Sequence, residues 1–309
     1  MFYKYAVDPN CYVNWDTFQP LRGGFGWNKG RLIAEFPRKK WMKTVKNFLI
    51  NNKGQLTPEQ KRTIECELSK FSLHKHKFFI KTTYDDMDKE QEWSLENAIE
   101  LSELFHAIIT HESSKSHSSI LVTSELVDNP LWEIDHMKDI NLTPNELCKS
   151  VESILIASQR ILFIDPYFKP WRNKWIETLE RFISCATNKR TPILEYHLKI
   201  EDKDYIESDK GKEQFEQECN NNLKKLLPHG RRLTVFRWNV KDHCGELFHD
   251  RYVISEYGGV LFTVGLDSRG EGKTTRVVRL TENSRQKCWD SFQKESQLYE
   301  YVDKVEVIG

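Results

Sequence analysis

The segment Phe248-His249-Asp250-Arg251 carries the side chains best suited to chemistry in this chain. The apolar residues that follow it, up to Ile254, predict a strand in which successive side chains point to opposite faces. His249 and Arg251 are therefore expected on one face. There the imidazole can attack phosphorus or carry protons, and the guanidinium can neutralise phosphate oxygens. Glu256, at the end of the strand, is a candidate to orient the imidazole.

Two other segments are expected near the same edge of a sheet. After the next predicted strand comes a glycine-led turn that ends in Asp267 and Ser268, which we expect to serve catalysis and substrate binding respectively. An upstream strand runs into Asp165 and, two residues later, Tyr167. Ligands of α/β proteins gather where strands end, so these two residues are candidates for substrate binding. A plain strand terminus with aromatic packing is the alternative for both.

The elements that must position these residues alternate regularly from Thr143 onward. Threonine followed by proline and an acid marks a helix start, and apolar runs separated by helical patterns indicate strands. This alternation predicts an α/β fold over 141–309, with a mixed sheet flanked by helices. The expected helices are 143–158, 175–186 and 214–227, and the expected strands are 161–164, 193–200, 233–238, 246–255 and 260–264.

Residues 1–140 predict a separate, mainly helical α/β region whose role the motifs do not define. Helical patterns cover 38–49, 57–71 and 93–109, and the second begins with the capping sequence Thr57-Pro58-Glu59-Gln60. The glycine-rich stretch 22–26 lacks the spacing and the following Lys-Ser/Thr of a phosphate loop. A turn is the expected structure there.

The order of these motifs resembles the phospholipase D superfamily over roughly residues 145–280. The family signature is His-x-Lys, an acid, and a second strand ending in Gly-Ser-x-Asn. Here His249-Asp250-Arg251 corresponds to the first part, Glu256 to the acid and Gly265-Leu266-Asp267-Ser268 to the last part. Arginine replaces lysine, glutamate replaces aspartate, and the gap before Gly265 is longer than usual. This combination is similar to a divergent branch that includes single-domain bacterial proteins associated with phage defence and the carboxy-terminal domain of a eukaryotic MIT-domain protein.

The resemblance implies a metal-independent phosphodiesterase, most simply a nuclease, that needs no cofactor. His249 would form a phosphohistidine intermediate, with Arg251, Glu256 and Asp267 completing the site. The family builds one site from two His-Lys motifs, and this chain offers one, so the resemblance implies a homodimer. A partner protein of a defence system is a further implication. The alternative is a catalytically silent module that binds phospholipid, nucleic acid or a protein partner.

Three rival sites depend on other residues. His197-Leu198-Lys199, followed by Asp204 and Gly211, fits the family spacing better, but the charged residues that follow it do not predict a buried second strand. A metal-dependent nuclease using Asp165 and Glu195 would need Glu-x-Lys, and position 197 is histidine. The third is a metal cluster of His243, Cys244 and His249. The cysteines of the chain are odd in number and scattered, which argues against a metal site.

Composition and charge place limits on the function. The 309 residues are 39% hydrophobic and 30% charged, no apolar run is long enough to span a bilayer, and the start lacks the pattern of a signal peptide, so we expect a cytoplasmic protein. Residues 1–81 carry 16 basic and 6 acidic side chains (+10), and residues 82–150 carry 4 and 15 (−11). The two segments could pack on each other. Alternatively, the basic segment around Lys39 and Lys40 could bind a polyanion such as nucleic acid.

Overall fold

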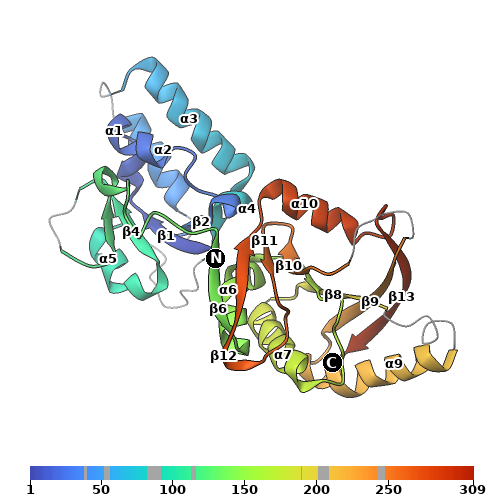
Figure 1. Ribbon diagram of the computed structural model, residues 1–309. Helices are drawn as coiled ribbons and strands as arrows, with labels where there is room; N and C mark the ends of the chain where they lie inside the picture. The colour runs from blue at the N-terminus through green and yellow to red at the C-terminus, as the bar shows by residue number, and fades with distance from the viewer. Residues whose placement is uncertain are drawn as a thin grey trace. The chain divides into compact units, whose positions relative to one another are not determined.

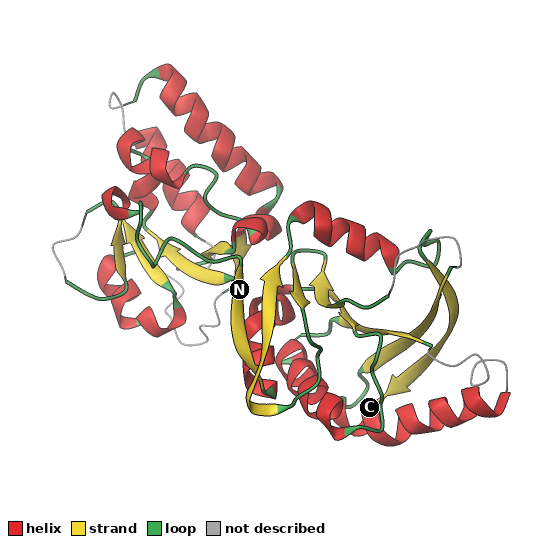
Figure 2. Ribbon diagram, viewed as in Figure 1, coloured by secondary structure: helices red, strands yellow, loops and turns green. Residues whose placement is uncertain are grey.

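The computed structural model describes residues 1–37, 40–51, 56–81, 92–112, 116–188, 190–200, 209–241 and 248–309. It divides into two compact units, one of Phe2–Asp135 and one of His136–Gly309 together with Met1. The expected boundary at residue 140 falls inside strand β6 (Met137–Leu142), which pairs with β12 (Gly270–Arg279) of the second unit. The mixed α/β content confirms the expected fold class (Figures 1 and 2).

The N-terminal unit is built around a five-stranded sheet in which every pairing is parallel. Its order is β3-β2-β1-β4-β5. The strands are β1 (Tyr3–Val7), β2 (Arg31–Ala34), β3 (Phe79–Ile80), β4 (Ala107–Thr110) and β5 (Ile120–Val122), and the longer helices are α2 (Trp41–Asn51), α3 (Pro58–Leu73) and α5 (Leu95–Glu100). The sequence pattern predicted α2, α3 and α5, but the helix expected over 93–109 was wrong in its last part, which contains the start of β4. The parallel sheet was not predicted because its strands are only two to five residues long.

The C-terminal unit contains an eight-stranded mixed sheet of order β13-β9-β8-β7-β10-β11-β12-β6. The three neighbours β7, β8 and β9 run parallel, and the other pairs are antiparallel. The remaining bounds are β7 (Arg160–Ile164), β8 (Ile193–Lys199), β9 (Arg232–Val240), β10 (Arg251–Ser255), β11 (Gly259–Phe262), β13 (Tyr299–Ile308), α6 (Pro144–Ala157), α7 (Asn173–Thr187), α9 (Asp209–Leu223) and α10 (Glu282–Ser291).

The central strand β7 is buried on both faces, as its continuous apolar sequence predicts. Phe163 stacks on Phe182 of α7, which packs beside α6 (Figure 1). Leu162 and Ile164 point the other way, into a cluster that contains Phe292 at the end of α10. Helices therefore cover both faces of the strand, and polar side chains reach solvent where the strand ends.

Helices α6 and α7 begin within two residues of their expected starts, and α9 begins five residues before its expected start. The Thr143 hydroxyl accepts a hydrogen bond from the amide of Glu146 and caps α6, and Thr281 caps α10 in the same way through Ser284. Strands β6, β12 and β13 and helix α10 were not predicted. Among the described residues, no helix is long and apolar enough to cross a membrane.

Candidate functional site

Three chain segments meet at one edge of the eight-stranded sheet because β10 is antiparallel to both of its neighbours. Tyr252 pairs with Ile164 of β7, and Arg251 pairs with Phe262 of β11. The start of β10 therefore lies beside the ends of β7 and β11. This edge gathers the predicted site residues Asp165, Tyr167, His249, Arg251, Asp267 and Ser268.

Tyr167 holds the histidine and the arginine together. His249 is exposed and precedes β10, and its Nδ1 lies 2.7 Å from the hydroxyl oxygen of Tyr167. The two rings are stacked, with an interplanar angle of 19°. The guanidinium carbon of Arg251 lies 4.7 Å from the centre of the same tyrosine ring, within cation–π range. His249 and Arg251 thus converge through the tyrosine and not through a shared strand face.

The guanidinium of Arg251 has a donor to offer. Its Nε is buried and has no hydrogen-bond partner among the described residues. A buried donor without a partner costs free energy, and an anion that accepts its hydrogen would recover that cost. The exposed imidazole of His249 contacts the same tyrosine. The pair therefore forms a candidate site for an anion such as a phosphate.

Asp165 connects three neighbouring groups at this edge through hydrogen bonds. Its side chain is buried and accepts hydrogen bonds from Trp175 Nε1 (3.0 Å) and from the amides of Tyr167 (3.0 Å) and Leu266 (3.2 Å). Burial raises the pKa of this carboxyl, and those hydrogen bonds oppose the rise. Both oxygens are engaged within the protein, so Asp165 positions Tyr167 and the turn after β11; the structure shows no role for it in direct contact with substrate.

Asp267 fixes two cations in the turn after β11. Its carboxylate, 1% exposed, pairs with Lys174 Nζ at 2.9 Å and with Arg269 Nε at 2.8 Å. Burial alone would raise the pKa of Asp267, but the hydrogen bonds from Arg269 and Lys174 hold it below its ordinary value. A Cβ on Gly265 would lie 2.3 Å from Asp267 Oδ1, so the turn needs glycine there.

Lys174 belongs to the site although no sequence motif pointed to it. It lies in the first turn of α7, about ninety residues before its partner Asp267, and its carbonyl accepts a hydrogen bond from the amide of Ser268 (2.7 Å). Sequence patterns reveal neighbours along one helix or strand, and this pair is neither. Ser268 itself is half-buried at the same turn.

Glu256 does not reach His249, and its expected role as the orienting acid is wrong. It follows the far end of β10, and the five-residue strand between the two side chains spans about 16 Å. Its carboxylate accepts hydrogen bonds from the amides of Gln159 (2.6 Å) and Arg160 (3.3 Å). Glu256 therefore closes the opposite edge of the sheet, and Tyr167 occupies the place expected for the acid.

The rival histidine, His197, lies in the core. It is 1% exposed on β8, where Trp238 Nε1 donates to its Nδ1 (3.0 Å) and its Nε2 lies 3.3 Å from Glu195. Burial lowers the pKa of His197, and the hydrogen bond with Glu195 opposes that shift. Glu195 also pairs with Arg160 at 2.8 Å, so it is engaged away from Asp165. Asp204 lies outside the described residues.

The remaining candidates fall elsewhere. Lys39, His243 and Cys244 lie outside the described residues. Lys40 is half-buried immediately before α2 and belongs to the N-terminal unit. Within the part of the chain that the structure describes, no three His, Cys, Asp or Glu side chains form a group that could hold a metal ion.

A second histidine–carboxylate pair, which no sequence motif indicated, lies in the N-terminal unit. Asp8 follows β1 and is 2% exposed, and its Oδ2 lies 2.8 Å from His111 Nδ1, after β4. The sheet order reverses between these two strands, which is where open α/β sheets bind ligands. The residues lie 103 positions apart, and this separation hides the pair from any local pattern.

Comparisons with known proteins identify no family. No protein-family model matches the sequence, and no curated protein matches it. Among solved structures, one similar chain is TrmBL2, described as an archaeal chromatin protein with a novel mode of DNA binding. It is 10% identical, the match covers 85% of this chain and 84% of that chain, and the TM-score is 0.25. A likeness at that score supports no conclusion about function.

Proposed function

We propose that the protein is a phosphodiesterase that cleaves nucleic acid through His249 without a metal ion. The observation that carries the proposal is the exposed imidazole whose Nδ1 contacts Tyr167, the residue that also contacts Arg251, whose Nε has no hydrogen-bond partner among the described residues. The resemblance of these segments to the phospholipase D superfamily supports the same chemistry. In that family's bacterial branch the role would lie in defence against phage, together with a partner protein.

In the proposed mechanism the hydrogen bond with Tyr167 fixes the orientation of the His249 ring. When Nδ1 carries the proton and donates a hydrogen bond to the phenol oxygen, the lone pair of Nε2 is available for attack. Nε2 forms a bond to phosphorus and the bond from phosphorus to the leaving oxygen breaks, while Arg251 stabilises the charge on the non-bridging oxygens. A second imidazole protonates the leaving oxygen. Water then attacks the phosphohistidine, the second imidazole takes up its proton, and His249 is regenerated.

The second imidazole is proposed to come from another copy of the chain. One chain contributes one histidine of this kind to the described edge, and a two-fold axis would bring two copies of His249 to one phosphate. Because the reacting atoms must lie about 3 Å apart, the two imidazoles would flank the phosphate from opposite sides. Cleavage should then require a homodimer, and a strictly monomeric sample that cleaves at full rate would contradict the shared site.

The test is cleavage of labelled single- and double-stranded DNA and RNA, with and without EDTA. We expect wild-type protein to cleave at least one substrate equally well in EDTA, and His249→Ala to lose cleavage. His229→Ala is the matched control, because His229 is exposed and precedes β9, at the opposite end of the parallel strands from the site. Cleavage that survives in His249→Ala, or that EDTA abolishes, would overturn the mechanism.

A binding module without catalysis is the second candidate. The observation that favours it is the placement of Glu256, which leaves His249 with a phenol instead of the carboxylate that the resemblance implied. The same assay separates the two candidates. The second candidate is supported if wild type cleaves none of the labelled strands but binds one of them, and if Arg251→Ala no longer binds that strand. The site would then bind phosphate groups without reacting with them.

A further inference from the structure

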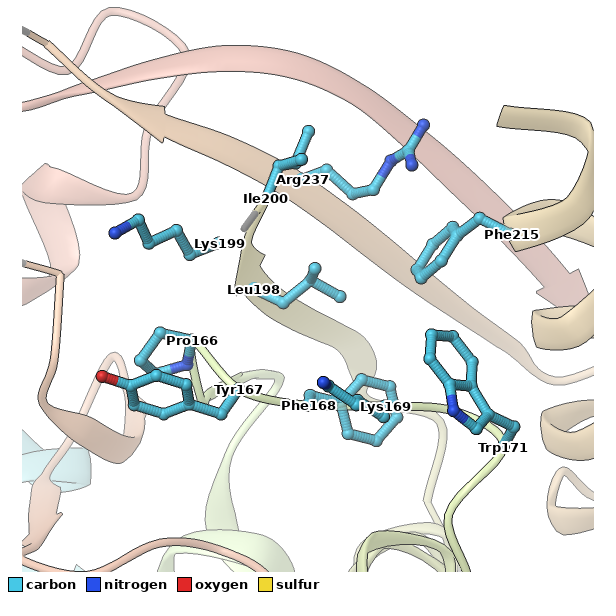
Figure 3. A pocket seen from close by; sticks show the side chains of 10 residues that line it. All are labelled: Pro166, Tyr167, Phe168, Lys169, Trp171, Leu198, Lys199, Ile200, Phe215 and Arg237. Carbon is cyan, nitrogen blue, oxygen red and sulfur yellow. The ribbon is translucent and has the colours of Figure 1, made fainter. Parts of the chain in front are cut away.

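A cavity of about 220 Å³ opens beside Tyr167 at the ends of β7 and β8. Figure 3 shows Trp171 and Phe215 at one end of it, and Lys199 and the Tyr167 phenol at the other. The phenol that lines the cavity is the group that holds His249 Nδ1. The cavity therefore adjoins the proposed reaction centre. Its lining consists of Pro166, Tyr167, Phe168, Lys169, Trp171, Leu198, Lys199, Ile200, Phe215 and Arg237.

The aromatic side chains of the cavity pack against residues outside it. Phe168 stacks on Tyr196 at 3.9 Å between ring centres. Phe215 of α9 lies under the guanidinium of Arg237, 4.7 Å from its carbon. Arg237 is 2% exposed and pairs with both oxygens of Asp303 at 2.7 and 2.6 Å. Its charge is therefore neutralised within the protein, and it supports Phe215 instead of binding an anion.

Trp171 is the exposed aromatic side chain of this cavity. Its side chain is 41% exposed although it is large and apolar, which leaves a flat indole face open to solvent. Proteins that bind single-stranded nucleic acids combine exposed aromatic rings, on which the bases stack, with cationic side chains that contact the backbone phosphates. Lys199 supplies a cation at the end next to Tyr167.

We infer that this cavity receives one unpaired nucleobase of the strand whose phosphate lies at His249; the inference rests on the proposed function. The volume decides the kind of ligand, because it is below the range of about 300–1,000 Å³ typical of larger ligands and suits a single ring system. A base inside a duplex is stacked and paired and cannot enter. The substrate is therefore a single strand or a duplex end, and not a continuous duplex or a lipid headgroup.

Binding measurements on His249→Ala test the cavity without cleavage. We would titrate that variant into a labelled single strand of about 12 nucleotides, the same strand with abasic residues, and the duplex, following fluorescence anisotropy. The base-bearing strand should bind roughly ten-fold more tightly than the abasic strand, and Trp171→Ala should remove that difference. Ile193→Ala is the control, because Ile193 is an exposed apolar side chain of the same unit, 58% accessible.

The outcomes separate the cavity from the catalytic proposal. If wild type cleaves nothing but the base-dependent difference is present and needs Trp171, the nucleobase site stands and the phosphodiesterase fails. If wild type cleaves but base-bearing and abasic strands bind equally, the nucleobase site is overturned and the phosphodiesterase stands. Binding to phosphatidic-acid vesicles that requires Trp171, with no binding to single strands, would also overturn it.

Discussion

His249 and His197 both lie in the C-terminal unit, one just before strand β10 and the other on strand β8, and their surroundings differ in access to solvent. His249 lies at the sheet edge, exposed, with one ring nitrogen held by Tyr167 and a cation beside it. His197 lies on β8, next to β7, where it is buried, and both of its ring nitrogens have protein partners. It also stacks on Phe236, at 4.9 Å between ring centres.

The difference shows that access, and not the neighbouring residues along the chain, decides what an imidazole can do. The sequence around His197 matched the expected spacing better, yet burial has lowered the pKa of His197 and closed it to any substrate. His249 has an imperfect motif but keeps one nitrogen accessible among the described residues. The two histidines should therefore respond in opposite ways to the same substitution.

The largest expected effect is this reversal. His249→Ala should reduce cleavage by about 10³-fold or more, since it removes the nucleophile, while the free energy of unfolding changes by less than about 0.5 kcal/mol. His197→Ala should lower the free energy of unfolding by about 3 kcal/mol or more, because it leaves a cavity and takes the partner from Trp238 Nε1. Cleavage assays and urea unfolding of both variants measure the effects. A folded His197→Ala protein that has lost cleavage would break the comparison.

Tyr167→Phe sharpens the edge site. The ring that contacts Arg251 remains, but the hydrogen bond to His249 Nδ1 is lost. The imidazole gains positive charge as its Nε2 bonds to phosphorus, and a hydrogen bond to a charged group contributes about 1.5–3 kcal/mol, so kcat should fall roughly ten- to a hundred-fold with KM nearly unchanged. Stability should stay close to wild type because the hydroxyl is at the surface. If the free energy of unfolding falls by as much as the activation free energy rises, Tyr167 has a packing role only.

Asp267→Asn tests the charge that organises the turn. Because the pKa of Asp267 is lowered in the folded state, its stabilisation is present above the unfolded pKa of about 3.9 and is lost as the pH falls through the lower folded value. The variant should be less stable than wild type by about 1–3 kcal/mol at neutral pH, with Lys174 and Arg269 left without their carboxylate. Urea unfolding from pH 7 down to about pH 3 should show the two proteins converging. If the difference in the free energy of unfolding between the two proteins stays constant across that range, the charge of Asp267 does not stabilise the turn.

The sequence predicted the elements from α6 to β11 of the C-terminal unit and the convergence of their ends, because apolar runs and capping residues are local signals, but it did not predict β6, β12, β13 or α10. Tyr167 and Asp267 were placed at the correct edge for that reason. Local patterns failed where the decisive partner is remote, as in Lys174 with Asp267 and Asp8 with His111. They also failed for Glu256, since a strand fixes which residues share a face but not which end of it meets the site.

The smallest expected effect concerns Glu256, and it decides whether the edge site is complete without a carboxylate. Glu256→Gln keeps one oxygen to accept from the amide of Gln159 or Arg160, so the free energy of unfolding should fall by no more than about 1 kcal/mol. Cleavage should match wild type, because the residue lies at the opposite end of β10 from His249. Measured under the conditions used for Tyr167→Phe, a ten-fold loss in Glu256→Gln would mean that the acid does act on His249, and that the phenol is not its functional replacement. An unchanged rate would leave Tyr167 as the group that orients the imidazole.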